Sequence, residues 1–414
     1  MKRKGIIMNR LYLALLISSC LISLNANAAP ITSEATVMPN SSLDKTTMLT
    51  NTKMVEKMAG KMVESSPLAT PLGLSEAAEQ YHILYTSISG IDGKSLREDS
   101  GAVFLPKGPM PQNGWPVVVW THGTIGVASK CAPSLNPRSA RDTQYLNTWL
   151  SMGFAIVAPD YPGLGSAGLH HYLDARAEAW SVLDSVKVAR EKFPLANQLI
   201  LVGQSQGAHA AFAAAGYQAE YAPELNIVAS VLTGTPYFKP GISAERLFSI
   251  DNQVTGGDPK LPYVMYSYLS AADQDNSLQP NDYFQDAAID TLAQANKLCI
   301  GELTELVMKK QMNAGNSLKP DIERVLTQQL PNFSYNTIKI NHPVFIGIGL
   351  ADINVPTLMQ QLFAKDVIAA GTPATVVEYP QMSHGETVNV SLRDSIPFVL
   401  QVINSPNIRT ESTK

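Results

Sequence analysis

The sequence predicts an α/β protein, in which a mostly parallel sheet carries helices on both faces and a helical cap is inserted late in the chain. Short runs rich in Val, Ile and Leu alternate with helical patterns, as expected for parallel strands buried on both faces. Of the 414 residues, 45% are hydrophobic and 16% are charged, which excludes a disordered chain and a polytopic membrane protein. No fixed repeat or long biased tract is present, which excludes collagen-like and repeat architectures.

Eight β-rich runs, each bounded by turn residues, are the predicted strands. They are residues 82–89, 102–105, 116–120, 154–158, 199–202, 227–232, 344–348 and 375–379. Helical periodicity predicts helices over residues 175–192, 206–218 and 357–370. Residues 241–338 interrupt the alternation after the sixth predicted strand, and strand-like runs resume at Val344. This order predicts a cap inserted into the sheet, with a separate helical domain as the alternative.

Residues 1–28 have the three parts of a secretory signal peptide. Basic residues precede an apolar run over residues 11–24, and Ala26-Asn27-Ala28 is a small-x-small cleavage pattern. The run of about 14 residues is short for a membrane span, so export is the expectation. Cys20 lies in a loose lipoprotein-type box, which makes lipid anchoring an alternative. We expect a secreted or periplasmic protein with no transmembrane segment in the mature chain.

Removal of residues 1–28 changes the charge and the cysteine count. It leaves 27 Lys and Arg against 35 Asp and Glu, a formal net charge of −8. This acidic balance argues against nucleic acid or an anionic membrane surface as a partner. Two cysteines remain, Cys131 and Cys299, and export favours a disulfide between them, with two buried thiols as the alternative. Neither has a CxxC neighbour, which argues against redox catalysis and zinc binding.

The segment Gly203-Gln204-Ser205-Gln206-Gly207 carries the central chemical signal. A Gly-x-Ser-x-Gly pattern is weak alone, but here a predicted strand precedes it and a helix-forming run follows it. A tight strand-to-helix turn strains the serine backbone and exposes the hydroxyl, and glycines avoid side-chain clashes in such a turn. Ser205 is therefore the candidate nucleophile, with an ordinary Gly/Ser turn as the alternative.

A serine nucleophile needs a base, and the base needs an orienting carboxylate. His384 follows the last predicted strand, and Asp352 follows the predicted strand over residues 344–348. The chain order Ser205, Asp352, His384 is nucleophile, acid and base, which is the order of an α/β-hydrolase. The sequence thus predicts these three residues as a catalytic triad.

Other titratable residues are not assigned to the triad. His209 lies four residues after Ser205 and is carried away along the helix, whereas His170 and His171 lie in a loop where they could contact substrate. Asp160 ends a predicted strand but precedes the serine, so it is interpreted as a turn residue.

Acyl transfer also needs donors for an oxyanion. One predicted donor is the backbone N–H of Gln206, directly after the nucleophile. The other comes from the loop Thr121-His122-Gly123-Thr124, where the N–H of Thr124 is favoured and that of Gly123 is the alternative. This chemistry requires no metal and no cofactor.

At these residues the chain resembles the secretory lipase family of α/β-hydrolases, which includes fungal lipases of the lipase A type and exported bacterial members. The matching segments lie within residues 115–390 and are Trp120–Thr124, Cys131–Ser134, Ala158–Gly165, Gly203–Gly207 and the contexts of Asp352 and His384. The resemblance implies ester hydrolysis by Ser205, His384 and Asp352 beneath a helical cap. It also implies a disulfide from the Cys131 segment to the cap, which fits Cys299.

These observations predict five segments. They are a signal peptide (1–28), an N-terminal tether (29–78) with a short helix near residues 53–63, a first part of the α/β-hydrolase core (79–240), a helical cap (241–338) and a second part of the core (339–414). Aromatic residues of the cap segment are candidates for an acyl pocket, with simple cap core as the alternative; they are Tyr263, Tyr266, Tyr268, Tyr283 and Phe284.

The predicted function is an exported carboxylic ester hydrolase, a lipase or esterase, that acts on an ester or lipid through an acyl-enzyme. A serine peptidase of the same fold is one alternative, although no site for a substrate amine or carboxylate is identifiable from the sequence. A non-catalytic exported binding protein on a hydrolase scaffold is another, and it predicts a broken triad.

Overall fold

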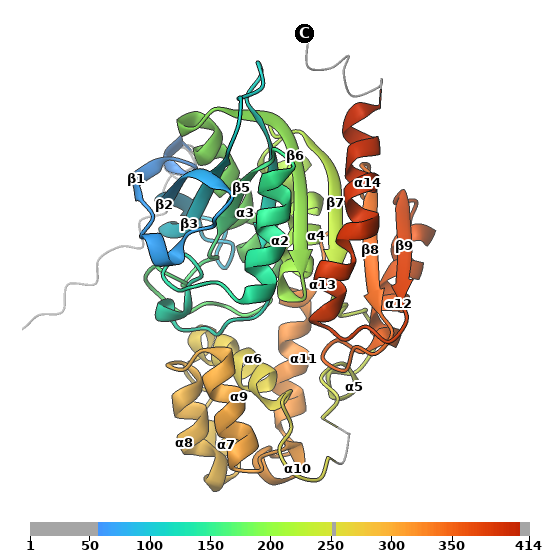
Figure 1. Cartoon of the computed structure of the whole chain (residues 1–414). Coiled ribbons are helices and arrows are strands. Elements are labelled where there is room, and N and C mark those ends of the chain that lie inside the picture. The colour runs from blue at the N-terminus through green and yellow to red at the C-terminus, as the bar shows by residue number, and fades with distance from the viewer. Residues whose placement is uncertain (1–56, 251–253, 406–414) are drawn as a thin grey trace, which may run out of the picture. The chain divides into compact units, whose positions relative to one another are not determined.

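The computed structural model describes residues 57–250 and 254–405 (Figure 1). The predicted signal peptide, Cys20 and much of the predicted tether lie outside the described residues. In the described part, nine strands form one sheet in the order β1-β2-β3-β5-β4-β6-β7-β8-β9. Their bounds are β1 Met62–Pro67, β2 Ala77–Ile88, β3 Leu96–Pro106, β4 Trp115–Thr121, β5 Ala155–Pro159, β6 Leu195–Gln204, β7 Ile227–Thr233, β8 Val344–Gly349 and β9 Ala374–Tyr379.

The sheet is antiparallel at one edge and parallel across the rest. β1 and β2, β2 and β3, and β3 and β5 pair antiparallel. Every pair from β5 through β4 to β9 is parallel, and β5, β7 and β8 are buried along their whole length. This confirms the predicted mostly parallel sheet. Because parallel strands point the same way, the residues that follow β4, β6, β7, β8 and β9 gather at one edge.

Helices cover both faces of the sheet. The helices of the sheet domain are α2 Ala140–Ser151, α3 Ala175–Lys192, α4 Gln206–Tyr221, α12 Thr357–Ala369, α13 Glu386–Val390 and α14 Leu392–Asn404, with 3-10 turns η1 Thr70–Leu72 and η2 Ser129–Cys131. One apolar cluster joins α3, α4 and α12 to one face, and a second joins α2 and α14 to the other face, in front of the strands in Figure 1. Successive side chains of β4 point to opposite faces of the sheet. Val117 and Val119 therefore belong to the first cluster, and Val118 and Trp120 belong to the second.

The predicted helices over residues 175–192, 206–218 and 357–370 correspond to α3, α4 and α12. α3 has the predicted bounds, and a side-chain cap explains its start. Asp174 Oδ1 accepts a hydrogen bond from Ala177 N at 2.9 Å, which satisfies a donor of the first turn.

The chain between β7 and β8 forms a layer of helices with its own apolar cluster, which we call the cap. Its helices are α5 Ala244–Leu247, α6 Leu261–Gln274, α7 Pro280–Tyr283, α8 Asp286–Ala295, α9 Ile300–Lys309, α10 Ala314–Ser317 and α11 Ile322–Phe333. They lie below the sheet domain in Figure 1. None of the helices described here has the length and apolar character that a membrane crossing requires.

The segment interpreted as a tether contributes the edge strand β1, which the sequence did not predict. β1 has the polar sequence MVESSP and is mostly half-buried or exposed, so it lacks the apolar run that marked the other strands. Of the helix expected near residues 53–63, Lys57 and Met58 are helical, but the expected range extends too far, because the strand begins at Met62. Because of β1, the cap follows the seventh strand of the sheet rather than the sixth.

Candidate active site

Ser205 lies in a strained turn between β6 and α4. β6 ends at Gln204, α4 begins at Gln206, and Ser205 between them has φ 60° and ψ −126°. A positive φ is rare for a residue with a side chain and persists only where the surrounding structure enforces it. Here the Ser205 N–H donates to Thr233 O at 2.9 Å, and the Ser205 carbonyl accepts from His209 N at 3.1 Å. Hydrogen bonds at both its N–H and its carbonyl therefore hold Ser205 in the strained conformation.

Gly203 and Gly207 allow this turn to pack against the end of β4. A Cβ on Gly207 would overlap the Thr121 carbonyl and lie 2.7 Å from His122 O. A Cβ on Gly203 would overlap the Gly207 carbonyl. No side chain fits at either position, which is the physical reason for the Gly-x-Ser-x-Gly pattern in this chain.

Asp352 and His384 form a hydrogen-bonded pair beyond the ends of β8 and β9. His384 Nδ1 lies 2.6 Å from Asp352 Oδ2, which also accepts from Gln360 Nε2 at 2.9 Å. Asp352 Oδ1 accepts from the N–H groups of Asn354 (2.9 Å) and Val355 (3.0 Å). These donors fix the carboxylate, and the carboxylate places the imidazole proton on Nδ1, so that Nε2 is an acceptor.

The acceptor of His384 is engaged by Gln204 rather than by Ser205. Gln204 Nε2 lies 2.8 Å from His384 Nε2, and the amide donates. The Ser205 hydroxyl has no hydrogen bond to any residue in the described ranges, although Ser205 and His384 line the same cavity. The structure thus brings Ser205 and His384 to one cavity, pairs His384 with Asp352 and leaves the Ser205–His384 link unformed. The sequence pattern had given Gln204 no role.

The two predicted sources of oxyanion donors lie beside Ser205. Gln206 is the first residue of α4, where the backbone N–H groups have no acceptor within the helix. The N–H groups of Gly123 and Thr124 donate to no acceptor in the part of the chain that the structure describes, and both residues line a cavity with Ser205. The Thr124 hydroxyl is 2.8 Å from Tyr172 Oη, which ties this loop to the loop before α3.

A buried polar network holds the side chain of Gln206. Gln206 Nε2 donates to Glu178 Oε1 and to His170 Nε2, each at 2.7 Å. Burial lowers the pKa of His170 to about 3, so the neutral ring donates from Nδ1 to Pro162 O and accepts at Nε2. Burial also raises the pKa of Glu178, against the nearby His209 and the hydrogen bond from Gln206, which lower it. The predicted loop histidine His170 therefore positions Gln206.

The remaining titratable residues that the sequence singled out have structural contacts. His171 Nε2 lies 2.8 Å from Asp273 Oδ2 of α6, so it joins the sheet domain to the cap. His209 Nε2 lies 2.7 Å from Phe333 O of α11. Asp160 is fully buried and accepts from Ser134 N at 2.9 Å, so it anchors the loop before α2.

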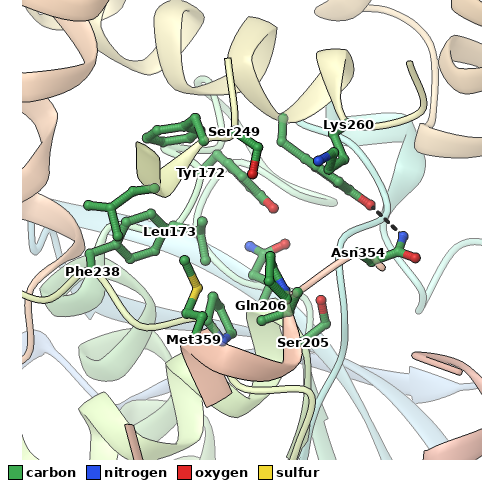
Figure 2. A pocket seen from close by; sticks show the side chains of 15 residues that line it. Tyr172, Leu173, Ser205, Gln206, Phe238, Ser249, Lys260, Asn354 and Met359 are labelled. Carbon is green, nitrogen blue, oxygen red and sulfur yellow. Dashed lines mark hydrogen bonds between the residues drawn. The ribbon is translucent and has the colours of Figure 1, made fainter. Parts of the chain in front are cut away.

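Two cavities meet at Ser205. The first, which we call the cap-side cavity, has a volume of about 70 Å³ (Figure 2). Its lining is largely apolar and comprises Tyr172, Leu173, Ser205, Gln206, Pro236, Phe238, Leu247, Phe248, Ser249, Lys260, Tyr263, Asn354, Val355, Pro356 and Met359. Figure 2 shows Phe238 and Met359 on one side, Ser205 and Gln206 at the base, and Ser249 and Lys260 opposite them.

The second cavity, which we call the core-side cavity, has a volume of about 460 Å³. It is lined by Trp120, His122, Gly123, Thr124, Ile125, Cys131, Pro133, Asn136, Pro137, Arg138, Ser139, Arg141, Asp142, Gln204, Ser205, Tyr263, Ile300 and His384. Tyr263 lines both cavities. The other cap aromatics named from the sequence, Tyr266, Tyr268, Tyr283 and Phe284, belong to the cap's apolar cluster instead.

A disulfide joins the cap to the loop that contains Thr124. Cys131 and Cys299 are bonded, with 5.5 Å between their Cα atoms, which is the connection that the family resemblance implied. Next to it, Ile300 N of α9 donates to Ile125 O at 2.8 Å. Both links fix the cap against the loop of the predicted oxyanion donors.

Comparisons with known proteins identify the family of the chain. The family model described as secretory lipase matches residues 134–392. Lipase A of Moesziomyces aphidis is 25% identical over 371 residues, which are 83% of this chain and 76% of that protein.

Solved structures share the fold. Candida antarctica lipase A in its closed state superposes with a TM-score of 0.67 at 20% identity, and the match covers 83% of this chain and 82% of that one. A putative hydrolase from Legionella pneumophila gives a TM-score of 0.69 at 19% identity, over 84% and 99% of the two chains. The predicted α/β-hydrolase fold is thereby confirmed. The chain belongs to the secretory lipase family and is a carboxylic ester hydrolase.

Proposed function

We propose that the chain hydrolyses carboxylic esters with Ser205 as nucleophile, His384 as base and Asp352 as the acid that orients the base. The observation that carries this proposal is the meeting of a strained Ser205 with the bonded His384–Asp352 pair at one cavity. The strained turn exposes a hydroxyl, and the pair supplies an imidazole whose Nε2 can accept its proton.

The reaction begins when the Gln204 amide leaves His384 Nε2 and the Ser205 hydroxyl takes its place. His384 Nε2 then accepts the hydroxyl proton while Ser205 Oγ attacks the ester carbonyl carbon. The N–H groups of Gln206 and Thr124 donate to the oxyanion. As the tetrahedral intermediate collapses, the C–O bond to the alcohol breaks and His384 returns the proton to the alcohol oxygen.

Water hydrolyses the resulting acyl-enzyme by the same route. His384 Nε2 takes a proton from water, the hydroxide oxygen attacks the acyl carbon, and the acid leaves as Ser205 Oγ regains the proton. The apolar cap-side cavity supports placement of the acyl chain against Phe238, Phe248 and Met359. The name of the matched family supports export, which we propose together with the signal peptide over residues 1–28.

Hydrolysis of a p-nitrophenyl ester series from acetate to palmitate tests the proposal. We expect turnover by the mature chain and its loss in Ser205→Ala, with the chain-length optimum separating an esterase from a lipase. Ser151→Ala, at an exposed serine of α2, is the matched control and should retain full activity. A folded wild-type chain that hydrolyses none of these esters would contradict the proposal and favour the peptidase or binding-protein alternatives.

A further inference from the structure

The position of His384 distinguishes the two cavities that meet at Ser205. In the proposed reaction, the alcohol oxygen must reach His384 Nε2 to receive its proton, so the alcohol lies on the side of the imidazole. His384 lines the core-side cavity, and it is absent from the described residues that line the cap-side cavity. The acyl chain therefore occupies the cap-side cavity and the alcohol occupies the core-side cavity.

Polar groups from one short stretch of the sheet domain line the core-side cavity. Arg141 and Asp142, at the start of α2, form an ion pair in which Nε and Nη2 each lie 2.8 Å from Asp142 Oδ1. Their side chains are 30% and 19% exposed, so the pair is accessible from the cavity but is not freely hydrated. Asp142 Oδ2 and the remaining guanidinium N–H groups have no partner among the described residues, so they can accept from and donate to a ligand.

Two neighbouring residues, Asn136 and Ser139, add further hydrogen-bonding groups to the lining. Asn136 Nδ2 donates to Lys130 O and Ala132 O, which leaves its Oδ1 as an acceptor. Ser139 Oγ accepts from Asp142 N, which leaves its hydroxyl proton as a donor. The lining therefore offers both donors and acceptors, which hydroxyl groups can satisfy because each hydroxyl both donates and accepts.

A purely alkyl alcohol fits the polar part of this lining poorly. Its entry would remove water from Arg141 and Asp142 without replacing the lost hydrogen bonds, and unreplaced hydrogen bonds of charged groups cost binding free energy. A hydroxyl-rich alcohol replaces them. The volume of about 460 Å³ leaves ample room for an alcohol larger than glycerol, such as a sugar ring.

We propose that the core-side cavity binds a hydroxyl-rich alcohol moiety, a sugar in preference to glycerol, through Arg141, Asp142, Asn136 and Ser139. This inference rests on the proposed function, because it assigns the leaving-group side of the same site. It makes Arg141 and Asp142 determinants of alcohol specificity that have no part in proton transfer.

The test keeps the acyl group constant and changes the alcohol. Release of butyrate is titrated for methyl 6-O-butyryl-glucoside, glyceryl monobutyrate and butyl butyrate, with p-nitrophenyl butyrate as the measure of the chemistry itself. We expect kcat/KM for the sugar ester to exceed that for butyl butyrate at least about tenfold, with the glyceryl ester between them.

Arg141→Met tests the residues. It should lower kcat/KM for the sugar ester about tenfold and change that for butyl butyrate less than about twofold. The matched control is Arg393→Met on α14, because Arg393 also pairs with the following acid, Asp394, at 3.1 Å but lies outside both cavities. Asp142→Asn, which keeps the backbone bond to Ser139, is the second variant if Arg141→Met does not fold.

The outcomes separate the two proposals. Wild-type hydrolysis of p-nitrophenyl butyrate with equal kcat/KM for sugar and butyl esters would overturn the alcohol site and leave the proposed function intact. A preference for the glyceryl ester over the sugar ester would overturn the choice of a sugar. Absence of any hydrolysis from a folded chain would overturn the proposed function and this inference with it.

Discussion

The sheet domain and the cap contribute different things to the candidate site. Ser205, Asp352 and His384 all follow strands of the sheet, whereas the cap contributes side chains to the cavity walls, such as Phe248 and Tyr263. The contrast teaches that the candidate reactive groups sit where parallel strand ends gather them, and that part of the cavity wall comes from an insertion with its own core.

The two regions also differ in how tightly they are constrained. In the sheet domain, Gly203 and Gly207 leave no room for a side chain, and Asp352 accepts four hydrogen bonds. The cap is joined to the sheet domain through the Cys131–Cys299 disulfide and the His171–Asp273 contact, among others. Substitutions at Gly203, Gly207 and Asp352 should therefore affect the reaction rate, and substitutions of residues that line the cavities, in either region, should affect substrate choice.

The largest expected effect is the loss of the base. His384→Ala should lower kcat for p-nitrophenyl butyrate by about 10⁶-fold, as removal of a triad base does elsewhere. The residues of the proposed triad act as a unit, so the double variant with Ser205→Ala should be no slower than either single variant. Steady-state kinetics measure both. A loss below a hundredfold in His384→Ala, or additive losses in the double variant, would show that the two residues do not act together.

The disulfide should have the next largest effect, because it links the two regions across 168 residues of chain. Replacing both Cys131 and Cys299 by Ser should lower the free energy of unfolding by about 4 kcal/mol. Urea unfolding measures it, and a reductant should bring the wild type to the level of the double variant while leaving the variant unchanged. If the wild type and the variant unfold at the same urea concentration without reductant, the disulfide contributes nothing to the free energy of unfolding.

A third test makes one substitution in each region. Gly207→Ala should lower the free energy of unfolding by about 3 kcal/mol, because the new Cβ overlaps the Thr121 carbonyl. Gly301→Ala in α9 of the cap is the matched control, since no atom lies within 4 Å of its Cβ position. It should raise the free energy of unfolding by about 0.5–1 kcal/mol, because alanine suits a helix better than glycine. Equal changes in the free energy of unfolding for Gly207→Ala and Gly301→Ala would show that the two positions are equally constrained.

The smallest expected effect is a pH dependence of the free energy of unfolding that comes from a buried histidine. No histidine lies within residues 241–338, so this pH dependence belongs to the sheet domain and not to the cap. Burial lowers the pKa of His342 to about 4 from 6.5, and its Nε2 lies 2.8 Å from Ser230 Oγ. The unfolded chain therefore takes up a proton below pH 6.5 that the folded chain does not, so this stability is present above pH 6.5 and is lost as the pH falls toward 4.

The expected loss from His342 between pH 6.5 and pH 5 is about 2 kcal/mol. Urea unfolding at these two pH values measures it as the difference between the wild type and His342→Gln, which keeps an acceptor for Ser230. The variant should show the smaller fall in stability. An identical pH dependence in both proteins would mean that His342 does not titrate as its burial implies.

The sequence predicted the buried parts of the fold well. Strands such as β7 and β8 are continuous apolar runs because both faces are covered, and α3 combines a capping Asp174 with a long helical pattern. Edge strand β1 has no such signal, because its residues are half-buried or exposed and its pairing with β2 depends on backbone hydrogen bonds. Helix α2 was missed, although Tyr145 and Trp149 are buried at helical spacing.

The residues of the candidate site also differ in how far the sequence could predict them. Ser205, Asp352 and His384 could be proposed as a triad from the sequence because strand ends and chain order constrain where such residues stand. The contact of Gln204 with His384 was not, because it depends on side-chain conformations 180 residues apart. Glu178 left a faint signal, since it shares the buried face of α3 with Val182, but a charged residue in a helical pattern ordinarily indicates a solvated face.

The central claim is that Ser205 carries the acyl group, and rapid acid quench during turnover of p-nitrophenyl butyrate tests it most directly. Peptide mass spectrometry of the quenched protein should find one butyryl group on the peptide that contains Ser205, and Ser205→Ala should show none. A butyryl group on another residue, or wild-type turnover that leaves Ser205 unmodified at every quench time, would contradict the claim.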